Sequence, residues 1–149
     1  ENIVSVFRAG AQVYLHAVVS GSYPKAENVA HAVDHSIQCF KTIPASDADR
    51  SLIFPLCITA CLVRTEEQKT YFRQRFASLK GIEREGNCYQ VSLGLDRRCG
   101  ACGHGITCCG FQVLLLVEEV WARREREGPA SSVEWWDVMK ALGNVILLV

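Results

Sequence analysis

The stretch Val113–Glu125, VLLLVEEVWARRE, decides how the rest of this chain is organised. Its apolar residues recur at helical spacing: Leu116, Val117, Val120 and Trp121. Its charged residues fall on the other side: Glu118, Glu119, Arg123 and Arg124. This pattern predicts an amphipathic helix that turns a tryptophan toward a core and its charged side toward solvent.

A second apolar helix is expected after the break at Gly128-Pro-Ala-Ser-Ser. Ser131 and Glu134 form a capping-box pattern, which starts helices by satisfying their free backbone N–H groups. The apolar stripe of this helix is Trp135, Val138, Met139 and Leu142. One of the two adjacent tryptophans, Trp135 and Trp136, is expected to pack and the other to lie at the rim.

Four more helices are predicted before the Cys-rich segment. Residues 3–19 carry the stripe Ile3, Phe7, Gly10, Tyr14 and Val18, and residues 25–42 carry Val29, Val33, Ile37 and Phe40. Two such helices joined by a short loop predict an antiparallel pair. A third, nearly all apolar, is expected from the weak capping pattern Ser46/Asp49 through Leu62, with its regular part beginning near Pro55. The fourth starts at the capping box Thr65/Gln68 and carries Tyr71, Phe72, Phe76 and Leu79.

The fold class predicted is therefore all-α, with six or seven helices packed mostly as consecutive antiparallel pairs. A chain of 149 residues with 49% hydrophobic residues can bury one core, so we expect residues 1–149 to form a single domain. The chain opens on Glu1 rather than Met, so we expect a piece of a longer protein. Uninterrupted apolar runs are short and residues 1–20 lack a signal-peptide pattern, which predicts a soluble intracellular protein without a membrane segment.

The charge balance bears on nucleic-acid binding. The chain has sixteen Lys and Arg residues and sixteen Asp and Glu residues, so its formal net charge is zero. Phosphate backbones are held largely by an excess of positive charge, which this chain lacks as a whole. The composition predicts a poor DNA binder.

Residues 91–112 differ in composition from the rest of the chain. They hold four of the eight cysteines and five of the eleven glycines. One interpretation is a small zinc-binding module built on Cys99, Cys102, His104 and Cys108, because a Cys-x-x-Cys pair with a nearby His and Cys supplies zinc ligands. The ligands are unusually close together, and Gly100, Gly103 and Gly105 provide no scaffold, which weighs against it.

The competing hypothesis is that residues 91–112 are a translated, unspliced intron. Gln90-Val91-Ser92 can be encoded by CAG GTG AGT, an intron donor sequence, and Phe111-Gln112 by TTC CAG, an acceptor. The 22 codons are in frame and contain no stop. Their removal gives GNCYQVLLLVEEVWARRE, one continuous amphipathic helix from Asn87 to near Arg126. An ordinary loop insertion is the remaining alternative.

The intron hypothesis predicts a specific peptide. Tryptic digestion of the natural protein should yield EGNCYQVLLLVEEVWAR, which joins residue 90 to residue 113. Mass spectrometry of the natural protein, or the cDNA sequence, checks this. Deep peptide coverage that contains only the Cys-rich form would refute the hypothesis.

Other reactive residues have simpler interpretations. His31 and His35 share a helix face but lack a third ligand, so solvated histidines are favoured over a metal site. Cys57 and Cys61 lie in the most apolar helix and are expected to be inert core residues. Glu118 and Glu119 point in different directions and cannot form a close catalytic pair. No phosphate loop, Gly-x-Ser-x-Gly or Cys–His pair is present, so we assign no catalytic, cofactor-binding or metal residue and expect no enzyme.

Three segments carry a resemblance to a known family: Phe54-Pro-Leu-Cys-Ile-Thr-Ala-Cys, Leu115-Leu-Val-Glu-Glu-Val-Trp-Ala-Arg-Arg and Trp136-Asp-Val-Met-Lys-Ala-Leu-Gly. With the opening Phe7-Arg-Ala-Gly-Ala-Gln-Val-Tyr-Leu, they resemble the C-terminal regulatory region of fungal zinc-cluster transcription factors. The resemblance covers the chain except residues 91–112. Its motifs carry over as packing positions: Phe54, Pro55, Trp121, Trp136, Met139 and Leu142.

The resemblance implies a helical regulatory domain of a nuclear transcription factor. In that family DNA is bound by a separate N-terminal cluster of six cysteines and zinc, and residues 99–109 do not reproduce its spacing. The implied function is therefore effector sensing or partner binding without DNA contact, with no cofactor in this segment and zinc only in the distant cluster.

Overall fold

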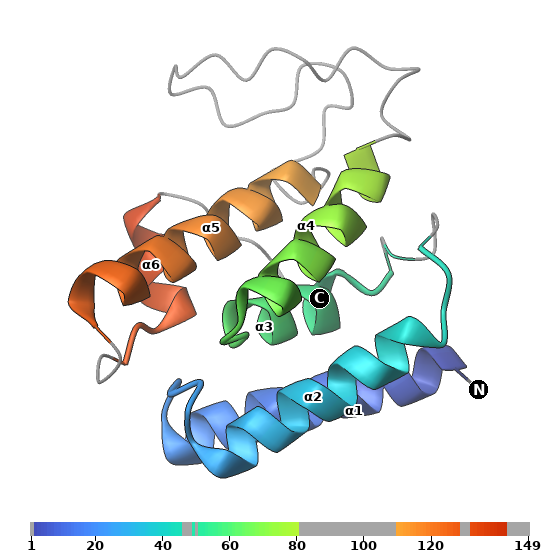
Figure 1. The fold of residues 1–149 in the computed structure, drawn as a ribbon, viewed down its shortest axis with the longest axis horizontal. Helices are drawn as coiled ribbons and strands as arrows, with labels where there is room; N and C mark the ends of the chain where they lie inside the picture. Colours follow the sequence, from blue (N-terminus) through green and yellow to red (C-terminus); the bar gives the residue numbers. More distant parts are fainter. Residues whose placement is uncertain (1, 46–48, 50, 81–109, 129–131, 143–149) are drawn as a thin grey trace.

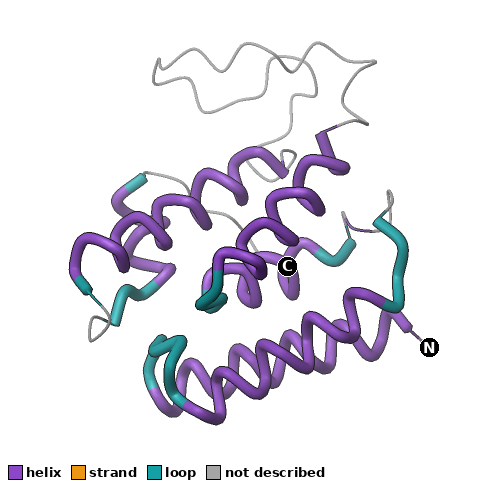
Figure 2. Tube along the Cα trace, viewed as in Figure 1, coloured by secondary structure: helices purple, strands orange, loops and turns teal. Residues whose placement is uncertain are grey.

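The structure is a computed structural model that describes residues 2–45, 49, 51–80, 110–128 and 132–142. Within these ranges the chain forms helices and no strand, as Figure 2 shows. The helices are α1 (Asn2–Ser20), α2 (Glu27–Lys41), α3 (Ile53–Cys61), α4 (Glu66–Lys80), α5 (Gly110–Glu127) and α6 (Trp135–Ala141). The predicted all-α fold class is confirmed.

The helices form two groups around α3. In Figure 1, α1 and α2 run antiparallel along one side, and α4, α5 and α6 lie on the other side. Helix α3 packs against α1, α2, α4 and α5. All its residues from Pro55 to Cys61 are buried, as expected for a helix that is apolar on every side.

The buried face of α1 differs from the predicted stripe. Ile3, Phe7, Tyr14 and Val18 are exposed, and the packed face consists of smaller residues: Val6, Ala9, Gly10, Val13 and Ala17. The reason is close approach to α3, because a Cβ atom on Gly10 would lie 2.5 Å from the Cβ of Pro55. Small side chains let two helix backbones pack at this distance, so the large residues of α1 face outward.

Helix α1 is also the one described helix long and apolar enough to cross a membrane by length and composition. It lies near the N-terminus, and 28% of its most apolar window is buried in this fold. Its small-residue face packs on α2 and α3.

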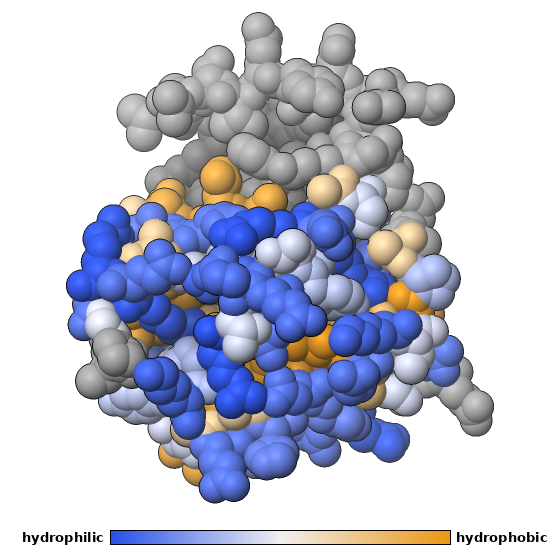
Figure 3. All heavy atoms as spheres, viewed as in Figure 1, coloured by the Kyte–Doolittle hydropathy of each residue, from blue (hydrophilic) through white to orange (hydrophobic). Residues whose placement is uncertain are grey.

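The predicted stripes of α2 and α4 are confirmed. Val29, Val33, Ile37 and Phe40 are buried in α2, and Phe72, Phe76 and Leu79 are buried in α4. The capping box that starts α4 is also present, since the Gln68 N–H donates to Thr65 Oγ1 at 3.2 Å and the Thr65 N–H donates to Gln68 Oε1 at 3.3 Å. In Figure 3 the face over α2 and α4 is mainly hydrophilic, with apolar atoms visible between the helices.

Two other predicted capping boxes are wrong. Helix α3 begins at Ile53, close to Pro55 as expected, and Asp49 is buried in contact with Arg75 instead of starting the helix. Glu134 is itself the residue before α6, and its carboxylate accepts from the hydroxyls of Ser22 and Ser132. The proposed partners Ser46 and Ser131 lie outside the described residues, as does the proposed helix start at Asn87.

The packing positions implied by the family resemblance are mostly in the core or at its margin. Pro55 and Trp121 are buried, and Phe54 and Met139 pack against the core. Trp135 packs against the core too, next to Trp136, which is half-buried. Leu142 is 40% exposed, which corrects its assignment as a packing position.

A buried ion pair joins three segments of the fold. The Arg75 guanidinium donates to both carboxylate oxygens of Asp49, at 2.8 and 2.7 Å. Its Nη1 also donates to the carbonyls of Phe40 and Ile43, at 2.8 and 3.1 Å, where α2 ends. Both side chains are almost fully buried. Burial opposes the charge of Arg75, but the interactions with Asp49 and Tyr71 together outweigh it and the pKa of Arg75 is raised.

Replacing Arg75 by Met should lower the free energy of unfolding by about 3–5 kcal/mol, because it leaves the Asp49 carboxylate buried without a partner. Urea unfolding followed by circular dichroism measures the loss. Arg64→Met is the matched control, since the Arg64–Asp34 pair is exposed and should contribute no more than about 1 kcal/mol. Equal losses in the two variants would contradict the structural role of Arg75.

Candidate functional site: the Trp121 junction

Trp121 connects the end of α3 with α4 and α5. Its Nε1–H donates to the backbone carbonyl of Ala60 at 2.8 Å, and the residue is 3% exposed. This contact confirms the sequence prediction of a core-facing tryptophan. The partner carbonyl belongs to the last turn of α3, and it also accepts from the backbone N–H of Val63 at 3.4 Å.

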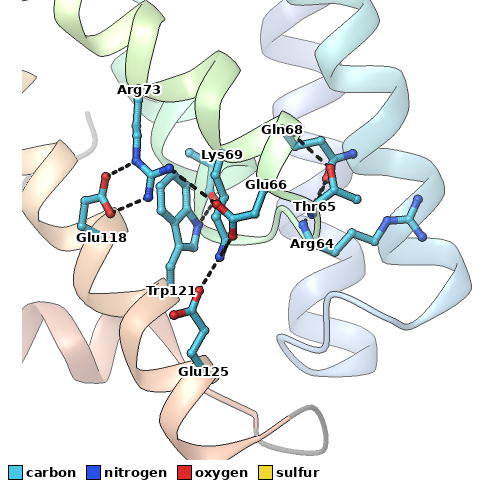
Figure 4. Close-up of polar contacts among 10 residues, drawn as sticks. Arg64, Thr65, Glu66, Gln68, Lys69, Arg73, Glu118, Trp121 and Glu125 are labelled. Atoms are coloured by element: carbon cyan, nitrogen blue, oxygen red, sulfur yellow. Dashed lines mark hydrogen bonds and ion pairs between the residues drawn. The ribbon is translucent and has the colours of Figure 1, made fainter.

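Two cations of α4 lie over the indole ring. The Arg73 guanidinium is 4.9 Å and the Lys69 ammonium 5.7 Å from a ring centroid of Trp121, within cation–π range. Figure 4 shows both side chains reaching from α4 toward the tryptophan of α5. The ring is thus covered by the methylene stems and charged groups of two side chains.

Carboxylates flank the two cations. Arg73 donates to both oxygens of Glu118, at 2.6 and 3.0 Å, and Lys69 contacts Glu66 and Glu125 at 2.6 Å each. Hydrogen bonding from Lys69 lowers the pKa of the exposed Glu66. For Lys69, burial opposes the charge, but hydrogen bonds to Glu125 and Glu66 outweigh it and raise the pKa. The positive charges at the junction are therefore balanced locally.

The two adjacent carboxylates of α5 have different partners, since Glu118 binds Arg73 of α4. Glu119 turns away from Glu118 and binds Arg123 and Arg126, at 2.8 and 3.1 Å. The hydrogen bond from Arg123 lowers the pKa of Glu119. Each carboxylate is held by its own arginine, so neither is the freely solvated group that the sequence suggested.

Arg124 is the main correction to the predicted polar side of α5. Its guanidinium lies inside the fold, where it donates to the carbonyls of Cys61, Ser22 and Val133. Burial lowers the pKa of Arg124. The Nε atom is buried and has no hydrogen-bond partner among the described residues. The signal was present in the sequence, because Arg124 follows Trp121 by three positions and so lies on the apolar side of the helix.

A small cavity opens beside this junction. Its volume is about 270 Å³, near the lower limit of small-molecule sites. Pro24, Val63 and Trp121 provide apolar wall, and the lining cations are Lys25, Arg64, Lys69 and Arg124. Arg64 and Lys69 already have carboxylate partners. The lining carboxylate, Glu125, is paired with Lys69 at 2.6 Å.

The structure also places the remaining reactive residues from the sequence. His31 and His35 are exposed, and His35 lies 3.8 Å from the sulfur of Cys39, in agreement with solvated histidines. Cys57 and Cys61 are fully buried, and their hydrogen bond together with burial raises the pKa of the Cys57 thiol, as expected for inert core cysteines. The described residues contain no group of three potential metal ligands. The proposed zinc ligands Cys99, Cys102, His104 and Cys108 lie outside them.

The chain belongs to the fungal specific transcription factor domain family, which matches residues 1–92. This confirms the family resemblance seen in the sequence, and the zinc-module alternative receives no support from it.

Two curated relatives are transcription regulators. The chain is 27% identical over 147 residues to the trichothecene biosynthesis transcription regulator TRI10 of Trichoderma arundinaceum, and 27% identical over 146 residues to that of Fusarium sporotrichioides. These alignments cover 99% and 98% of this chain but 30% and 29% of the relatives. The chain thus spans about a third of their length. No solved structure matches.

Replacing Trp121 by Ala should lower the free energy of unfolding by about 3–5 kcal/mol, because the buried ring and its hydrogen bond to Ala60 are both lost. Denaturant unfolding measures the change. Trp136→Ala is the control, since Trp136 is half-buried and its loss should cost less. A loss below about 1 kcal/mol for Trp121→Ala, the range of surface substitutions, would show that this ring is not part of the core.

Proposed function

We propose that residues 1–149 act as one helical regulatory domain of a nuclear fungal transcription regulator, which binds partners without contacting DNA itself. In this proposal DNA is bound by a separate N-terminal zinc cluster, and no cofactor is held by this segment. The family and its transcription-regulator relatives support the general assignment. One hydrophobic core that includes residues from Val6 to Val138 supports a single domain.

The net charge and the partners of the basic side chains support the absence of DNA contact. The chain has no net positive charge. Its described arginines and lysines are largely engaged inside the protein: Arg75 with Asp49, Arg73 with Glu118, and Arg124 with backbone carbonyls. A cation already paired with a protein group must give up that partner to bind a phosphate, which weakens the electrostatic term that dominates DNA affinity.

Two features bear on the kind of partner. The cavity beside Trp121, about 270 Å³, is smaller than most small-molecule sites, which disfavours a small effector. The outward side of α1 carries several exposed large apolar side chains, among them Leu15 and Val19. Contiguous apolar surface of this kind is typical of protein-binding sites. We therefore favour a protein partner over a small effector.

The proposal predicts that the purified chain does not bind duplex DNA. Fluorescence anisotropy with a labelled mixed-sequence duplex of about 30 base pairs should show no saturable binding at about 50 mM salt, where electrostatic binding is strong. A zinc-cluster DNA-binding domain serves as the positive control. Binding by residues 1–149 with an affinity that falls steeply as salt rises would contradict the proposal, because that dependence reports phosphate contacts.

A further inference from the structure

Most of the outer face of α1 is left uncovered by the described helices, although its Tyr14 ring packs edge-on against Phe54 of α3, with 6.1 Å between the ring centroids. Val4, Leu15 and Val19 join the exposed Ile3, Phe7, Tyr14 and Val18 on the side opposite the packed small residues. These seven side chains are between 40% and 75% exposed. In Figure 1, α1 lies at the edge of the molecule, with α2 beside it and α3 on its inner side.

The spacing along this face is symmetrical about Ala11. Val4 and Val18 each lie seven residues from Ala11, and Phe7 and Leu15 each lie four residues from it. Tyr14 is three residues after Ala11 on the same side of the helix as Phe7. A contact between two copies related by a two-fold axis requires such self-complementarity, because each half of the surface meets the other half.

We propose that the outer face of α1 pairs with the same face of a second copy, in an antiparallel arrangement that crosses at Ala11. The inference extends the partner-binding part of the proposed function and names the partner as a second copy of this chain.

The contacts of this arrangement follow from helix geometry. The small side chain of Ala11 lets the two helices approach at their crossing. Val4 of one copy then lies opposite the partner's Val18, and Phe7 lies opposite the partner's Leu15, so apolar side chains meet on both sides of the crossing. Arg8 is the one arginine or lysine in α1, and its methylene stem can cover apolar surface while its charge stays in water.

The area available is sufficient for a specific contact. The exposed parts of the seven side chains amount to roughly 600 Å² per copy, so a contact that covers all of them buries at most about 1,200 Å² for the pair, against the roughly 1,000 Å² expected of a specific interface.

A disulfide cross-link at residue 11 tests the geometry. Ala11→Cys should form a linked dimer under mild oxidation, because residue 11 of each copy lies at the two-fold axis. Mass spectrometry should find two linked copies of the tryptic peptide of residues 9–25, which contains no natural cysteine. Val4→Cys should not link to itself, and self-linking there would overturn the antiparallel arrangement.

Sedimentation velocity over a concentration series tests the pairing itself. The chain should associate to dimers, and Leu15→Glu should weaken the association roughly 100-fold or more, since it places a carboxylate in the apolar contact of both copies. Gln38→Glu is the matched control, because Gln38 is exposed on α2 and is not part of the outer face of α1. Circular dichroism of both variants verifies that helix content is unchanged.

The contradicting outcomes are distinct. A chain that stays monomeric at every concentration overturns the pairing, and a different segment or protein would then cover the outer face of α1. The DNA-binding experiment of the proposed function does not depend on this outcome. A monomer that binds phosphatidylcholine vesicles through Leu15 would instead identify a membrane-binding face and would also overturn the pairing.

Discussion

The packing of this domain depends on the way α5 satisfies the C-terminal end of α3. A helix leaves its last carbonyls without partners within the helix. In α3 the carbonyl of Ala60 accepts from the backbone N–H of Val63 at 3.4 Å, and α5 supplies further donors. Trp121 donates to the carbonyl of Ala60, and Arg124 donates to the carbonyl of Cys61. Both donors lie on one face of α5, three residues apart. These two hydrogen bonds position α5 on α3, and its apolar residues Leu116, Val117 and Val120 then fall into the core.

Two arginines bind backbone carbonyl groups at the ends of different helices. Arg75 of α4 binds the carbonyls of Phe40 and Ile43 after α2, and Arg124 of α5 binds those around the end of α3. A guanidinium suits both places because it offers five donors in a fixed plane. The difference is electrostatic: Arg75 has the carboxylate of Asp49 and its pKa is raised, whereas Arg124 has carbonyl groups and burial lowers its pKa.

The spacing of apolar residues along each helix correctly predicts the parts of the fold that depend on one helix alone. The stripes of α2, α4 and α5 are right because large aliphatic and aromatic residues face the core there. The stripe of α1 is wrong because helix approach at Gly10 favours small residues, and a search for large apolar side chains selects the opposite face. Asp49 and Glu134 have capping-type spacing, but partners distant in sequence, Arg75 and Ser22, determine what their carboxylates do.

At the Trp121 junction, too, the sequence predicts what one helix determines but not the contacts between helices. The burial of Trp121 could be read from its spacing within α5, but its partners Ala60, Lys69 and Arg73 come from other helices. No spacing rule within one helix connects residues about 50 or 60 positions apart, so these contacts required the three-dimensional arrangement. Arg124 is an intermediate case, because its position on the apolar side was visible while its carbonyl partners were not.

The junction also bears on how far residues 91–112 affect the domain. Helix α5 begins at Gly110, so Gly110-Phe111-Gln112 forms its first residues. Removal of residues 91–112 would put Cys88-Tyr89-Gln90 in their place, with an aromatic residue again second and Gln again directly before Val113. The residues that contact α3 and α4, from Val113 to Glu125, keep their order and their helical phase in either form. The end of α3 would therefore be satisfied by Trp121 and Arg124 whether the segment is an intron or an insertion.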